Sequence, residues 1–193
     1  MRIRTKWHNK GREVSIEEKA NTLAFISWRI AMKLVLNLEN ENFQTDTQSQ
    51  RLDVISEVLA FLVSVSDRLV SEQMEEDERR ELITHMALKL ANTYQENCED
   101  LIARETDYKA GFIETMNQRL NAYAECGWNS EKEEPGFQYK RDFGDCISQQ
   151  MGEKDNKWIT EHIIEIEVPE AMETLKKAKY EMVDGRSTAR LGN

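Results

Sequence analysis

The sequence has few of the residues that interrupt helices. Its 193 residues include only two prolines and eight glycines, while Glu, Lys, Leu, Ala and Met are plentiful. These abundant residues are strong helix formers, and no internal repeat of solenoid length is present. A chain of this length can bury a sizeable core without a disulfide or a structural metal. We therefore expect an all-α fold, a single bundle of six to seven helices.

Several chemical signatures are also missing. The three cysteines, Cys98, Cys126 and Cys146, form an odd set without CxxC spacing. This pattern favours free thiols in a reducing compartment and predicts a cytoplasmic protein. No secretory signal is expected, since the first apolar run begins late and follows several glutamates. The motifs GxGxxG, GxxxxGK[ST] and GxSxG are absent, so the sequence gives no support for dinucleotide binding, phosphate binding or a serine nucleophile.

The charge of the chain is strongly acidic, with a formal net charge of −10 and 32% charged residues. Such a surface disfavours a nucleic-acid role. The exception is residues 1–12, a basic arm without acids that contains Arg2, Arg4, Lys6, Trp7, Lys10 and Arg12. The arm either folds back onto the acidic body, with Trp7 covering a helix end, or grips an acidic protein or nucleic acid.

The stretch 23–38 is the most apolar part of the chain, with twelve apolar residues among sixteen. Arg29 and Lys33 lie in its middle, and this excludes a membrane span. On a helical wheel its apolar surface extends past half the circumference, so the helix requires neighbours on several sides. Ser15 and Glu18 have the spacing of a capping box, which predicts a helix over about 15–39.

A second apolar helix is predicted over about 47–72, where Thr47 and Gln50 form another capping box. We expect these two helices to be the central antiparallel pair. Val168–Pro169 is expected to interrupt a helix, because proline disfavours helical geometry in the residue before it. The remaining helices are predicted over about 75–104, 107–126, 137–151, 154–167 and 169–183, with a loop over 128–136. The helical domain thus spans 13–184, followed by a flexible tail, 185–193.

Acidic residues and histidines on the predicted helices suggest one kind of chemistry. Metal sites in helical bundles use inward-facing carboxylates and histidines, often with Glu-x-x-His spacing. This chain contains two Glu/His pairs near apolar faces, but neither has that order, and a histidine there is more commonly a boundary residue. The candidate ligands are Glu57, Glu81, His85, Glu114, His162 and Glu165.

Two further groups of residues are candidate sites. A buried charge requires a partner, so charges within the two apolar helices predict an ionic network at the bundle edge or a small-anion or polar-ligand site. This group is Arg29, Lys33, Glu57, Asp67 and Arg68. An aromatic group near the long loop either seals one end of the bundle or, if exposed together, forms an interface. It consists of Trp128, Phe137, Tyr139 and Phe143, to which Trp7 of the arm is added.

Two very apolar helices in a chain of this size favour either complete enclosure or association with a second copy. We therefore predict a non-enzymatic binding or regulatory protein that acts through protein–protein contacts, as a homodimer. No cofactor and no membrane association are expected. One alternative is a helical metalloprotein or small-ligand enzyme that uses Glu and His on facing helices. Another is an adaptor whose basic arm grips an acidic partner.

Overall fold

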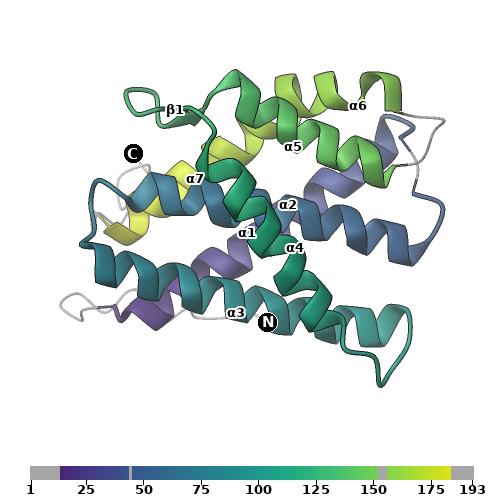
Figure 1. Ribbon diagram of the computed structural model, residues 1–193, viewed down its shortest axis with the longest axis horizontal. Coiled ribbons are helices and arrows are strands. Elements are labelled where there is room, and N and C mark those ends of the chain that lie inside the picture. The colour runs from purple at the N-terminus through teal and green to yellow at the C-terminus, as the bar shows by residue number, and fades with distance from the viewer. Residues whose placement is uncertain (1–13, 44, 152–155, 184–193) are drawn as a thin grey trace, which may run out of the picture.

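The computed structural model describes residues 14–43, 45–151 and 156–183 and consists of packed helices (Figure 1). The basic arm and the C-terminal tail predicted from the sequence lie outside these ranges. The helices are α1 (Ile16–Asn40), α2 (Gln48–Val70), α3 (Glu76–Leu101), α4 (Tyr108–Ala124), α5 (Phe137–Gln150), α6 (Asn156–His162) and α7 (Val168–Val183). The prediction of an all-α bundle is confirmed.

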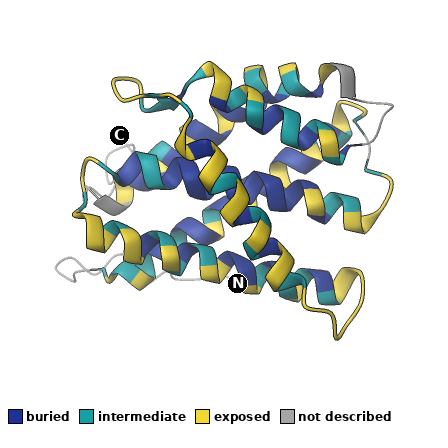
Figure 2. Ribbon diagram, viewed as in Figure 1, coloured by how far each residue is buried: buried dark blue, intermediate teal, exposed yellow. Residues whose placement is uncertain are grey.

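Helix α2 is the centre of the bundle and packs against α1, α3, α4, α5 and α7 (Figure 1). Most of its residues are buried, including Ser56, Ser64 and Ser66, as the dark blue of Figure 2 shows. Around Phe61 lies an aromatic core in which Phe143 stacks at 4.0 Å between ring centroids. Within the described residues, no helix combines the length and hydropathy that a membrane span requires.

Helix α1 is less enclosed than the sequence predicts. It packs on α2, α3 and α7 and buries a face that includes Leu23, Leu34 and Leu38. The other face of α1 is exposed to solvent. The central pair is therefore unequal, with α2 mostly enclosed and α1 at the surface.

The predicted capping boxes mark the starts of both helices. At α1, the Glu18 backbone N–H donates to Ser15 Oγ, and the Ser15 backbone N–H donates to the Glu18 carboxylate. At α2, the Gln50 N–H donates to Thr47 Oγ1, but the side-chain oxygen of Gln50 accepts from the backbone N–H of Asp46. The second box is thus only half formed, because Gln50 bonds one residue further back.

Helices α3 and α4 are separate. Ile102 ends α3, and the Asp107 carboxylate caps α4 by accepting from the Ala110 backbone N–H. Gln95 joins the two helices, donating to the Thr106 carbonyl at 2.8 Å and accepting from the Lys109 N–H at 2.8 Å. These bonds position the start of α4 against the C-terminal part of α3.

The predicted loop over 128–136 contains a small hairpin, in which β1 (Trp128–Asn129) pairs antiparallel with β2 (Glu134–Pro135). Two lysines of α7 attach it to the bundle. Lys176 Nζ donates to the Lys132 carbonyl at 2.7 Å, and the buried Lys179 pairs with Glu133. The hairpin therefore packs against α7.

The expected interruption at Val168–Pro169 is wrong. The helical path continues from α6 through a π-helical turn, η2 (Ile163–Glu167), into α7. A widened turn relieves the clash between a proline ring and the carbonyl four residues before it, so the chain need not leave the helix. The turn also directs Glu167 inward, where it accepts from Asn37 Nδ2 at 3.2 Å and lies 3.1 Å from His162 Nε2.

Candidate interaction surface

The open face of α1 carries three large apolar side chains in one line. Phe25, Met32 and Leu36 are 62%, 39% and 51% exposed. Their spacing of seven and four residues places them on the same side of the helix. We call these three residues the α1 stripe. Single exposed apolar residues are ordinary on a protein surface, but an aligned set along one helix is typical of an interaction site.

The charges beside the stripe are all positive. Arg29 lies between Phe25 and Met32, with its guanidinium carbon 5.9 Å from the centroid of the Phe25 ring. Lys33 follows one turn later and is also exposed. Between Glu18 and Glu39 the helix contains no acid. The exposed side of α1 is therefore apolar and cationic on a chain whose net charge is −10.

A groove of about 440 Å³ separates α1 from α7. Lys33 crosses between the two helices and pairs with Glu170 at 2.9 Å, a contact that raises the pKa of the lysine. The lining is a mixture of apolar and charged side chains, namely Ile26, Arg29, Ile30, Lys33, Thr174, Lys177, Ala178 and Glu181. The groove therefore presents apolar side chains next to charged ones.

The exposed side of α7 has the opposite electrostatic character to α1. Its outward residues include Glu170, Glu173 and Glu181, with Lys177 as the cation among them. One exposed aromatic residue, Tyr180, lies beside them. A cationic helix and a mainly acidic helix thus run next to each other on one surface, which we call the α1–α7 face.

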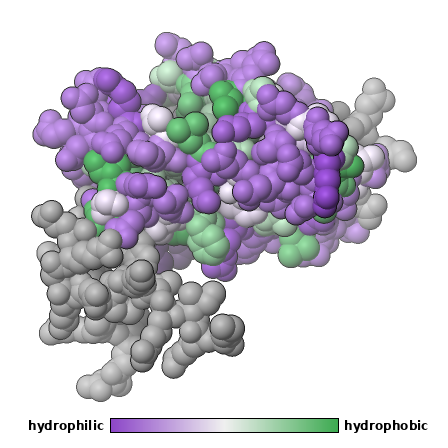
Figure 3. All heavy atoms as spheres, turned by 90° about the horizontal axis from the view of Figure 1, so that it is seen from below, coloured by the Kyte–Doolittle hydropathy of each residue, from purple (hydrophilic) through white to green (hydrophobic). Residues whose placement is uncertain are grey.

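Figure 3 shows the molecule from below, where hydrophobic groups form small clusters among hydrophilic ones. Large continuous apolar patches are absent from the part of this view that the described residues occupy. The α1–α7 groove has a mixed lining of apolar and charged side chains, so an interface there would combine apolar anchors with charge.

The ionic network predicted from the sequence is not formed. Each of its five members has a different neighbour in the described structure. Lys33 pairs with Glu170, Glu57 with Arg119, and Asp67 with Arg79 at 3.6 Å. Arg68 donates to the Ala124 carbonyl at 2.8 Å, and Arg29 lies over Phe25. The members lie on separate faces of α1 and α2, and later helices supply the opposing groups.

The candidate metal ligands are also dispersed. In the described ranges, no three His, Cys, Asp or Glu side chains are close enough to bind one metal ion. His85 lies 3.7 Å from Glu81 on the outer side of α3, and His162 lies beside Glu167 at the π turn. Glu114 accepts from Gln118 one turn later in α4. Glu165 is exposed, and Glu57 belongs to the pair with Arg119.

The aromatic group divides between core and surface. Tyr139 and Phe143 are buried against Phe61, and the Tyr139 hydroxyl bonds to Ser64. Phe137 is 67% exposed and Trp128 is partly buried, while Trp7 lies outside the described residues. The group is therefore not exposed together, which was the condition for treating it as an interface. Periodicity alone could not separate its inward members from Phe137.

Sequence reasoning recognised Arg29 and Lys33 but did not join them to α7. The helical wheel of residues 23–38 did contain a signal for this surface, because it places Phe25, Met32 and Leu36 on the same side as the cations. No comparable signal marks Glu170 or Glu181, whose importance depends on how α7 packs beside α1.

Comparison with known proteins gives no further guide, since no family model, no curated protein and no solved structure matches this chain.

Proposed function

We propose that this protein is a non-enzymatic binding protein that acts through protein–protein contacts, and that a second copy of the chain binds its α1–α7 face. The supporting observation is the α1 stripe, an aligned apolar set exposed beside a groove. Burial of these side chains against a partner is favourable in proportion to the area removed from water. The proposal also includes a regulatory role, exercised through this association.

Charge complementarity favours a second copy as the partner. In a two-fold dimer the same surface is used by both subunits. An axis that passes through the groove places α1 of one subunit on α7 of the other. Arg29 of each copy would then face the partner's acidic α7, while Lys33 stays paired with Glu170 of its own chain. Phe25 of each copy would enter the partner's groove.

A reducing, cytoplasmic location remains part of the proposal. All three cysteines are free thiols, and Cys98 is buried as a small apolar side chain. Lysis of cells directly into denaturant with an alkylating agent, followed by mass spectrometry of the three cysteines, tests this location. Disulfide-linked cysteines in freshly lysed cells would contradict it.

The decisive experiment measures oligomeric state by sedimentation velocity and native mass spectrometry. The wild-type chain should be a dimer, and Phe25→Glu should convert it to a monomer because two charges would be buried at the interface. Phe137→Glu is the matched control, since Phe137 is equally exposed on α5. A wild-type chain that stays monomeric at high concentration, or a Phe25→Glu variant that remains dimeric, overturns the proposal.

A charge exchange tests the orientation of the two copies. Arg29→Glu should weaken the dimer by bringing acids against the acidic α7 of the partner. Adding Glu181→Arg to the same chain should restore the dimer, because each α1–α7 contact regains opposite charges. If the double variant associates no better than the single one, α1 does not face α7 of the partner.

A further inference from the structure

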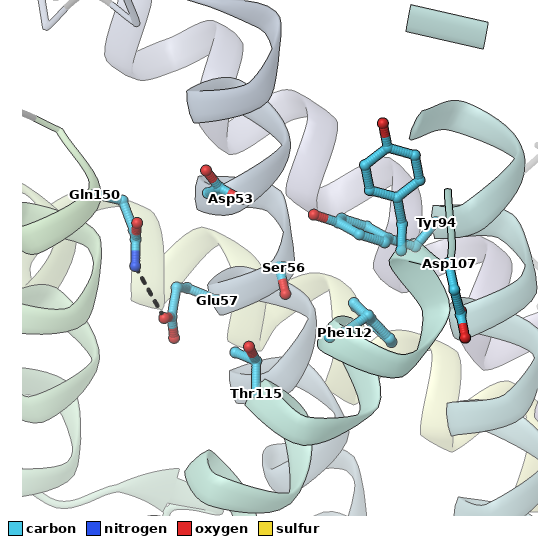
Figure 4. A pocket seen from close by; sticks show the side chains of 10 residues that line it. Asp53, Ser56, Glu57, Tyr94, Asp107, Phe112, Thr115 and Gln150 are labelled. Atoms are coloured by element: carbon cyan, nitrogen blue, oxygen red, sulfur yellow. Dashed lines mark hydrogen bonds between the residues drawn. The ribbon is translucent and has the colours of Figure 1, made fainter. Parts of the chain in front are cut away.

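A second cavity lies on the other side of α2, between α2, α3, α4 and the end of α5 (Figure 4). Its volume is about 300 Å³, within the range of small-molecule sites. Acidic, hydroxyl and aromatic side chains line it, namely Asp53, Ser56, Glu57, Tyr94, Asp107, Tyr108, Phe112, Thr115 and Gln150, together with Gly111. The cavity does not share a lining residue with the α1–α7 groove.

Glu57, at the inner end of the cavity, is already neutralised. The residue is 2% exposed, and its two carboxylate oxygens accept from Arg119 Nε at 2.6 Å and Arg119 Nη2 at 2.7 Å. Gln150 Nε2 donates to the same carboxylate at 3.3 Å, as the dashed line in Figure 4 marks. This bidentate pair joins α2 to α4 at the wall of the cavity.

Asp53, one turn before Glu57, is an exposed acidic residue at the edge of the cavity. Its carboxylate makes no hydrogen bond or ion pair with any residue in the described ranges. Burial and the charge of Glu57 raise the pKa of this carboxyl. Asp107 adds a second acidic group at the rim, where it caps α4. The cavity therefore favours a cation and disfavours an anion.

Ser56 adds a hydroxyl group to the cavity wall. The residue is 6% exposed, yet its hydroxyl has no hydrogen-bond partner among the described residues. Figure 4 shows this hydroxyl directed into the space between α2 and α4. The Ser56 hydroxyl therefore opens into the cavity and is available to hydrogen-bond a ligand there.

The opposite wall is aromatic. The rings of Tyr94 and Phe112 stack with centroids 4.8 Å apart, and Tyr108 lines the cavity beside them. The faces of such rings attract cations. Gly111 keeps room in front of this wall, since a Cβ atom placed there would meet nothing within 4 Å.

We propose that this cavity is a binding site for a small organic ammonium ion. The Asp53 carboxylate pairs with the ammonium group, the Ser56 hydroxyl accepts a hydrogen bond from it, and the Tyr94–Phe112 wall contacts its apolar part. This site is separate from the α1–α7 face, so ligand binding to it can be tested independently of dimer formation.

Isothermal titration calorimetry with three probes of similar shape tests the proposal. Benzylamine, a cation at neutral pH, should bind, while benzyl alcohol and benzoate should bind at least about tenfold more weakly. Asp53→Asn should weaken benzylamine binding about tenfold or more, and Ser56→Ala severalfold. Asp77→Asn is the matched control, because Asp77 is exposed in the first turn of α3, and it should bind like the wild type.

A further variant separates loss of the site from loss of the fold. Gly111→Leu fills open space on α4 and should abolish benzylamine binding while the helical circular dichroism is retained. Absence of benzylamine binding to the wild type overturns the proposal. Equal binding of benzoate, or unchanged binding by Asp53→Asn or by folded Gly111→Leu, also overturns it.

Discussion

At the scale of single residues, the Glu57–Arg119 pair is the most consequential polar contact in the described bundle. Glu57 is almost fully buried, whereas the Arg119 side chain is 24% exposed. Removal of the arginine leaves a buried carboxylate without its cation, which is costly. The pair therefore stabilises the contact between α2 and α4 through the penalty for separating its members.

We expect Arg119→Met to lower the free energy of unfolding by about 3 kcal/mol. Urea denaturation at neutral pH measures this loss. The double variant Glu57→Met with Arg119→Met should recover most of it, because no buried charge remains. Arg80→Met is the control and should change stability by less than about 0.5 kcal/mol, since Arg80 pairs only at the surface. If Arg119→Met costs no more than Arg80→Met, the carboxylate of Glu57 is not desolvated.

Cys126 should be an unreactive thiol at neutral pH. Burial, together with the hydrogen bond from its Sγ to Asp142 Oδ2 at 3.4 Å, raises its pKa to about 11. Because the thiolate is the reactive form, alkylation by iodoacetamide should accelerate as pH rises toward 11. Asp142→Asn removes the neighbouring charge and lowers the pKa, so alkylation at pH 8 should accelerate severalfold.

Peptide mapping by mass spectrometry follows Cys126 separately from the other two thiols. Asp145→Asn is the control on the same helix, since Asp145 bonds to Thr160 rather than to a cysteine. A rate at Cys126 that responds equally to both substitutions would show that Asp142 does not hold the proton on the sulfur.

At the scale of elements, two helical glycines have opposite surroundings. A Cβ at Gly111 of α4 would meet nothing, whereas one at Gly144 of α5 would lie 3.0–3.2 Å from Thr160 on α6, backbone atoms included. Glycine weakens a helix unless close packing requires it. Gly144 thus permits the close approach of α5 and α6, and Gly111 leaves space in the cavity.

We expect Gly111→Ala to raise the free energy of unfolding by about 0.5–1 kcal/mol through helix propensity. Gly144→Ala should lower it by about 1–3 kcal/mol, because the extra methyl group forces α5 away from Thr160. The two variants serve as controls for each other in the same denaturation experiment. A stabilising effect of both would mean that the α5–α6 contact adjusts without strain.

At the scale of the whole molecule, the proposed dimer couples stability to concentration. Association stabilises the folded chain by mass action, so the melting temperature should rise with protein concentration. Differential scanning calorimetry of the wild type should show this rise, and Phe25→Glu should melt at a temperature independent of concentration. Phe137→Glu should behave as the wild type does. A concentration-independent wild-type melting temperature would count against the dimer.

Much of the secondary structure followed from local information. Helical periodicity, the caps at Ser15 and Thr47, and the scarcity of proline and glycine act within a few residues, so the sequence alone was sufficient for the all-α prediction and for the starts of α1 and α2. The wrong prediction at Val168–Pro169 has both a local and a tertiary cause, because the π turn accommodates the proline and also brings Glu167 to Asn37 of α1.

The sequence by itself determined that two apolar helices begin at capping boxes and that buried charges such as Glu57 require partners. It could not name those partners, because Arg119 lies 62 residues further along the chain. Tertiary packing alone decided that α2 is mostly enclosed while α1 exposes Phe25, and that Asp53 and Ser56 line the same cavity as Tyr94 and Phe112. Helix period specifies which residues share a face, but only the packing of distant helices specifies which faces are covered.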